Sequence, residues 1–195
     1  MRALVLLATL SACVRTPPAS EAPDPIEALG RAGISDTRLA DLLVDAWRFT
    51  LTTSPELATS LGLPGYDHLV SDPSVRAADM AQIARRRFLD RAERIDPATL
   101  DARDRMFHAL FVARQASDLA LRACRTETWA LSPRSSALVD LFGLLDVQPI
   151  GDAAERAALL QRLDAWAGVL PDHMEALRTG KAEGRVATRA SLERV

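Results

Sequence analysis

Apolar residues recur along the chain at the three- and four-residue spacing of amphipathic helices. A first helix is expected after Ser35 or Asp36, either of which can cap it. Its apolar stripe consists of Leu39, Leu42, Leu43, Ala46 and Trp47. Two longer helices are predicted over residues 73–95 and 100–125. No segment alternates apolar and polar residues over more than a few positions, so the pattern predicts an all-α protein.

The stripes of the two long helices are expected to face the core. The first stripe contains Ala77, Met80, Ala81, Ala84, Phe88 and Ala92. The second contains Met106, Leu110, Ala113, Ala120 and Leu121, with Phe107 and Phe111 beside it. His108 lies among these residues, and we interpret it as a core or boundary histidine with one hydrogen bond rather than as a metal ligand.

Proline follows a capping residue at several places, which predicts repeated helix starts joined by short loops. These pairs are Ser54-Pro55, Asp72-Pro73, Asp96-Pro97 and Ser132-Pro133. Asp152 and Glu155 have the spacing of a capping box. The helix after them carries Leu159, Leu160, Leu163 and Trp166, and a further helix is expected after Pro171, ending near Gly180. The expected architecture is a multi-helix array with short Pro/Gly turns.

The stretch "SPELATSLGLPGYDHL", residues 54–69, ends in an unusual loop. Gly62 fits a left-handed helix C-terminus, and Pro64-Gly65 fits the centre of a type II turn. Asp67 can hold the turn by accepting backbone N–H groups. Tyr66, Asp67 and His68 are the candidate cleft-facing residues, but adjacent loop residues point in different directions, so a structural turn is the favoured interpretation.

The first residues have the pattern of an export signal: Arg2 is followed by an apolar run over residues 3–10. The "LSAC" motif at residues 10–13 resembles the lipobox of bacterial lipoproteins, which are cut before the cysteine and acylated on it. The alternative is an ordinary secretory signal cut near Ala12. We therefore expect a signal peptide at 1–12, an acylated Cys13 with a Pro-rich tether over 13–34, and a helical domain over 35–195.

A lipid on Cys13 would anchor the protein in the cell envelope, on the outer-membrane or periplasmic side, with the membrane as its partner. The chain has 195 residues, 26% of them charged, and a net charge of −2, which does not favour nucleic acid. The Arg85-Arg86-Arg87 run is interleaved with acidic residues and is interpreted as a solvated helix face. Cys124 is expected to be a small buried hydrophobe.

The chain shows no local motif of a catalytic or metal centre. His68, His108 and His173 are far apart in sequence, and neither a nucleophile elbow nor a phosphate loop is present. Asp172, His173 and Glu175 begin a predicted helix and could supply one metal ligand, although a solvated helix start is favoured. The residues therefore predict no catalytic residue, no metal ligand and no cofactor in this chain.

Three segments resemble the bacterial family known as domain of unknown function 885, over roughly residues 39–195. They are "DLLVDAWRFTLTTSPELATSLGLPGYDHLVSDPS", "FLDRAERIDPATLDARDR" and "RLDAWAGVLPDHMEALRTGKAEGRVATRASLERV". The resemblance implies an all-helical fold and, in much longer members, a zinc-dependent peptidase or hydrolase with a His-Glu motif in the second half. No residue here matches those metal ligands, so none is carried over.

We therefore expect this chain to be the N-terminal part of a larger helical domain, truncated and inactive alone. In a longer parent it would help to wall a cleft for a peptide substrate. The alternatives are a stand-alone helical binding or scaffolding lipoprotein and a non-functional gene remnant.

Overall fold

The computed structural model describes residues 24–132, 134 and 137–194. Cys13, the signal peptide and Pro133 lie outside the described residues. Within them every regular element is helical and none is a β-strand, which confirms the all-α prediction. The elements are α1 (Pro25–Arg31), α2 (Thr37–Thr53), α3 (Pro55–Ser60), α4 (Val75–Glu93), η1 (Pro97–Thr99), α5 (Ala102–Leu121), η2 (Arg122–Cys124), η3 (Thr126–Thr128), α6 (Ala137–Leu145), α7 (Ala153–Ala182) and α8 (Arg189–Leu192).

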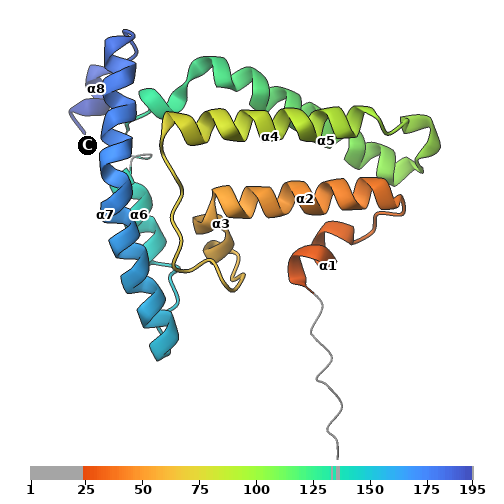
Figure 1. Ribbon diagram of the computed structural model, residues 1–195, viewed down its shortest axis with the longest axis horizontal. Helices are drawn as coiled ribbons and strands as arrows, with labels where there is room; N and C mark the ends of the chain where they lie inside the picture. The colour runs from red at the N-terminus through yellow and green to blue at the C-terminus, as the bar shows by residue number, and fades with distance from the viewer. Residues whose placement is uncertain (1–23, 133, 135–136, 195) are drawn as a thin grey trace, which may run out of the picture.

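The helices form two groups that meet at one end of the molecule (Figure 1). In the first group α2, α4 and α5 lie side by side, and α1 packs on α2. In the second group α6 lies beside the long α7, which crosses the ends of α2 and α4. The segment 61–74 leaves α3, runs along this junction and enters α4. None of the described helices is long and apolar enough to cross a membrane.

Two apolar clusters hold the first group together. One is formed by Leu39, Leu42, Ala92, Ile95 and Leu100 and joins α2 to α4 and the start of α5. The other is formed by Ile26, Leu51, Ala58 and Leu63, with Trp47 and Tyr66 packed against it. Burying a leucine side chain contributes about 1.5–3 kcal/mol, so these clusters are a principal source of stability.

Asp36 rather than Ser35 caps α2, since its carboxylate accepts the N–H groups of Arg38 and Leu39. The backbone N–H groups of Ser35 and Asp36 donate in turn to the buried carboxylate of Asp104, at 3.0 and 2.7 Å. Asp104 thus joins the first turn of α5 to the beginning of α2.

The outer face of α5 differs from the prediction. Met106, Leu110 and Leu121 were expected to be buried, yet Leu110 is 60% exposed and the other two are similarly open. The helix instead turns Asp104 and His108 inward, because both satisfy backbone groups of neighbouring segments. Met80 on α4 is likewise exposed. Apolar spacing identified the helices and the buried face of α2, but not the face that α5 buries.

His108 is buried, and its Nε2 lies 2.8 Å from the carbonyl oxygen of Ala92. The prediction of a core histidine with one hydrogen bond is therefore confirmed. Cys124, by contrast, is exposed, so the prediction that it is a buried hydrophobe is wrong. The α-helix ends at Leu121, and the chain then reverses at Arg125, whose φ of 45° is left-handed; Cys124 lies in this reversal rather than on a packed helix.

Two helix boundaries also differ. The helix predicted to begin after Asp72-Pro73 begins at Val75, where the Ser74 side chain accepts the N–H of Ala77. Residues 25–31, inside the range predicted to be a tether, form α1, which buries Ile26 against α2.

The helix predicted to begin at Pro171 does not exist as a separate element. α7 runs from Ala153 to Ala182 and contains Pro171. Proline cannot donate to the carbonyl of Ala167, but both residues are exposed, so water can satisfy that oxygen. Leu160 and Leu163 also face solvent. The capping box of Asp152 and Glu155 is present as predicted.

At Gly180 the backbone of α7 lies close to η3. A Cβ atom at this position would overlap the carbonyl oxygen of the buried Thr128 in η3. We expect Gly180→Ala to lower the free energy of unfolding by about 1–3 kcal/mol through overpacking. Gly168→Ala in the same helix meets no atom within 4 Å and should stabilise by about 0.5–1 kcal/mol. Urea unfolding of both variants checks this; equal effects would contradict the close contact.

Candidate functional site

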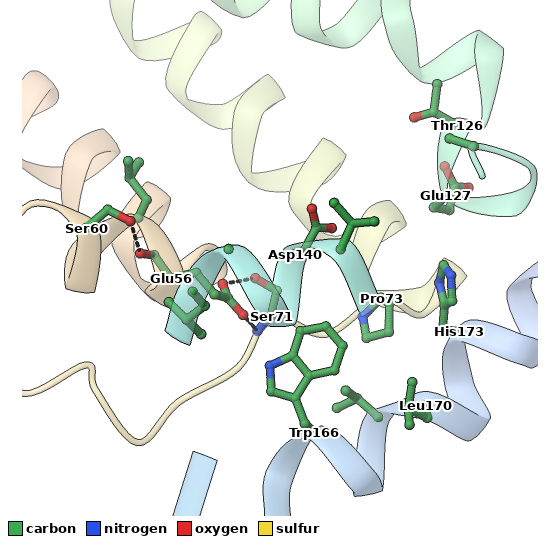
Figure 2. Close-up of a pocket in the computed structure, with 16 residues that line it drawn as sticks. Glu56, Ser60, Ser71, Pro73, Thr126, Glu127, Asp140, Trp166, Leu170 and His173 are labelled. Atoms are coloured by element: carbon green, nitrogen blue, oxygen red, sulfur yellow. Dashed lines mark hydrogen bonds between the residues drawn. The ribbon is translucent and has the colours of Figure 1, made fainter. Parts of the chain in front are cut away.

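A pocket of about 720 Å³ lies where the two groups of helices meet (Figure 2). Its walls come from α3, the segment before α4, η3, α6 and α7. Half of the lining residues are apolar, including Leu57, Val169 and Leu170. The polar side chains with an ionisable or hydrogen-bonding group are Glu56, Ser60, Ser71, Thr126, Glu127, Asp140, Trp166 and His173. Apolar walls with a few convergent polar groups are typical of small-molecule binding sites.

Glu56 is fixed at the pocket by the segment that follows α3. Its Oε1 accepts the backbone N–H of Ser71 at 2.8 Å, and its Oε2 accepts the Ser71 hydroxyl. Figure 2 shows these two bonds holding the carboxylate on the wall of the pocket. A carboxylate that is ionised has further lone pairs, so Glu56 can accept more hydrogen bonds from a ligand.

Asp140 on α6 is exposed and lines the pocket. Burial raises the pKa of its carboxyl, the negative charge of Glu56 raises this pKa further, and His173 lowers it. Among the described residues no hydrogen-bond donor or ion-pair partner engages this carboxylate. Glu127, in contrast, forms an ion pair with Arg122 at 2.7 Å. Asp140 is therefore the acidic group of the pocket that is open to a cation.

Trp166 contributes an indole N–H without an acceptor. The residue is only 9% exposed, and its buried Nε1 has no hydrogen-bond partner within the described part of the chain. Trp129 shows the usual arrangement, because its Nε1 donates to the carbonyl of Cys124 at 2.7 Å. The Nε2 of His173 is also buried and unpartnered. Figure 2 shows the Trp166 indole rising from α7 into the middle of the pocket wall.

Arg162, one turn before Trp166 on α7, organises the loop beside the pocket. It is 1% exposed, and its guanidinium donates to four oxygen atoms. These acceptors are Thr59 Oγ1 at 2.9 Å, Gln148 Oε1 at 2.5 Å, and the carbonyl oxygens of Tyr66 at 2.5 Å and Leu69 at 2.8 Å. Burial lowers the pKa of Arg162, while the charges of Glu56 and Asp67 act in the opposite direction.

The loop adopts the turns that its sequence predicts. Gly62 and Gly65 have φ angles of 68° and 92°, as a helix C-terminus and the third position of a type II turn require. The N–H of Leu63 donates to the carbonyl of Ala58 at 2.9 Å, which completes the end of α3.

The three candidate cleft-facing residues do not line this pocket. Tyr66 packs on the cluster around Leu51 and Ala58, and His68 is exposed. Asp67 accepts the Thr59 hydroxyl at 2.8 Å rather than the predicted backbone N–H groups, and its carbonyl accepts from Gln148 at 3.3 Å. All three positions belong to the structural loop that Arg162 holds.

The pocket residues that the sequence did not reveal come from separate segments. Glu56, Asp140 and Trp166 are at least 26 residues from one another, and no local motif joins them. One signal was present for Arg162: it lies three residues after Leu159 and four before Trp166, on the inward stripe of α7. An arginine inside an apolar stripe indicates a buried charge that needs several acceptors.

The zinc that the family resemblance implies was tested against the residues present. In the described ranges no group of three or more His, Cys, Asp or Glu side chains is arranged to hold a metal ion. The acidic residues and His173 of the pocket thus do not fit a metal site.

Arg162 provides a sharp test of this arrangement. We expect Arg162→Met to lower the free energy of unfolding by about 3–5 kcal/mol, because it leaves buried acceptors unpaired. Arg178→Met on the same helix removes an exposed ion pair with Glu175 and should cost less than about 0.5 kcal/mol. Chemical unfolding measures both. A small effect of the Arg162 substitution would show that the loop does not depend on this side chain.

Comparison with known proteins identifies the family. The profile of the family "Bacterial protein of unknown function (DUF885)" matches residues 55–195, which include α3 and every residue of the pocket. A search of curated proteins gives no match. Because the match spans well over half of the chain, the protein belongs to the bacterial DUF885 family.

Proposed function

We propose that this chain is the helical, ligand-binding region of a lipid-anchored cell-envelope protein, and that it holds a peptide in the pocket between α3, α6 and α7. The pocket carries the proposal, since it combines an apolar wall with the free carboxylate of Asp140 and the unpartnered N–H of Trp166. This combination fits an organic ligand that has both an apolar body and polar ends.

The "LSAC" motif and the apolar run before it support the envelope location. In this proposal the signal peptide is removed, and the acyl chains on Cys13 insert into the membrane on the periplasmic side. Each buried CH₂ contributes about 0.8 kcal/mol, so several acyl chains hold the protein firmly.

The resemblance to zinc-dependent peptidases supports a peptide as the ligand. The proposal assigns binding to this chain and no catalytic step. In a longer parent protein the pocket would position a peptide for chemistry carried out elsewhere; a stand-alone lipoprotein would use the same pocket for binding alone. A gene remnant would have no reason to bind a ligand, so a binding experiment separates it from both.

The anchor is tested at Cys13. We expect metabolic labelling with a palmitate analogue to mark the wild-type chain and to disappear in Cys13→Ser, which has no thiol to acylate. Cys124→Ser is the matched control and should keep the label, since Cys124 lies outside the signal region. Labelling that persists in Cys13→Ser would refute the lipid anchor.

The pocket is tested by filling it. Gly143 on α6 lines the pocket, and a Cβ there meets no atom within 4 Å. We expect a mixture of unblocked tripeptides to bind the purified full chain in ligand-detected NMR, and Gly143→Phe to abolish this binding. Gly168→Phe also has open space around it but lies outside the pocket lining, so it should keep binding. Equal binding by both variants, or none by the wild type, would overturn the proposal.

A further inference from the structure

We propose that the pocket recognises an α-amino acyl group, with the ammonium held by Asp140 and Glu56, the carbonyl by Trp166, and an apolar side chain against Leu57, Val169 and Leu170. This inference rests on the proposed function, and it adds which end of a peptide enters the pocket. Asp140, Glu56 and Trp166 line the same pocket and come from three different helices, α6, α3 and α7 (Figure 2).

The charge of the pocket favours a cation. Its lining contains three carboxylates and neither lysine nor arginine. Glu127 is neutralised by Arg122, whereas Asp140 has no partner in the described structure. Glu56 is held by Ser71, a neutral residue, and Arg162 acts on it through space without an ion pair.

The indole N–H of Trp166 has no hydrogen-bond acceptor among the described residues, and a simple protonated amine could not supply one. A buried donor without an acceptor costs roughly 1–3 kcal/mol, and a ligand carbonyl would remove that cost. In Figure 2 the Trp166 nitrogen points to the side of Ser71 and Glu56, and all three residues line the same pocket. An ammonium separated from a carbonyl by one carbon satisfies this requirement.

Apolar side chains form much of the remaining wall. Leu57 comes from α3, one residue after Glu56, and Val169 and Leu170 follow Trp166 by one turn on α7. An apolar group on the carbon that links the ammonium to the carbonyl would lie against these residues. The class of ligand is therefore an amino acid amide, or a peptide N-terminus, with an aliphatic first side chain.

Three small probes separate the parts of this inference in ligand-detected NMR titrations of the full chain. Leucine amide has the ammonium, the carbonyl and the aliphatic side chain. N-acetyl-leucine amide lacks the positive charge, and 3-methylbutylamine lacks the carbonyl. We expect leucine amide to bind about tenfold more tightly than either of the other two, because each of those lacks one hydrogen-bonding group and the loss of one hydrogen bond generally lowers affinity by about this factor.

Two substitutions connect the probes to residues. Asp140→Asn should reduce the affinity for leucine amide about tenfold and leave that for N-acetyl-leucine amide unchanged. Asp146→Asn, a nearby exposed position outside the lining, is the control. Trp166→Phe keeps an aromatic ring but removes the N–H. It should lower the affinity for leucine amide and leave the affinity for 3-methylbutylamine unchanged. Unchanged binding of 3-methylbutylamine also shows that the variant is folded.

The outcomes distinguish this inference from the proposed function. If tripeptides bind but leucine amide and its acetylated form bind equally, recognition of the ammonium is wrong and the pocket remains a peptide site. If Asp140→Asn weakens both probes equally, Asp140 does not act through charge, and the inference is again wrong. If no peptide and no probe binds, the proposed function fails as well.

Discussion

The buried guanidinium of Arg162 is the interaction on which the junction between the two groups of helices depends. Through four donated hydrogen bonds it fixes the side chain of Thr59 on α3, two carbonyls of the following loop, and Gln148 after α6. A buried cation is costly unless its donors are satisfied, and here the loop backbone supplies half of the acceptors. The side chain and the loop are therefore each required for the other to be stable.

This constraint positions the pocket without forming part of it. Arg162 and Trp166 lie one turn apart on α7, so holding the first against the loop places the second against the pocket wall. Thr59 and Glu56 are also one turn apart on α3, with Thr59 bonded to Arg162 and Glu56 on the pocket. The same two helices thus carry a structural polar network on one side and the binding groups on the other.

Local physical chemistry made much of the fold predictable. Caps such as Asp36 and Asp152, the left-handed Gly62 and the helical spacing of apolar residues depend only on neighbours in sequence. The inward face of α5 was not predictable in this way. Asp104 is buried because it accepts hydrogen bonds from backbone N–H groups just before α2, and His108 because its ring lies against a backbone carbonyl of α4. Those partners are distant in sequence. The pocket residues, too, come from segments that are distant in sequence.

The family match sharpens the interpretation of the loop. It begins at residue 55, so it covers α3, the loop and α7 but neither α1 nor α2. The loop "LGLPGYDHL" is a candidate site in the sequence because it places a phenol, a carboxylate and an imidazole next to one another. Its backbone carbonyls, however, bond to Arg162, and Asp67 bonds to Thr59. This stretch consequently holds Arg162, one turn before Trp166 of the pocket, and supplies no group to the pocket lining itself.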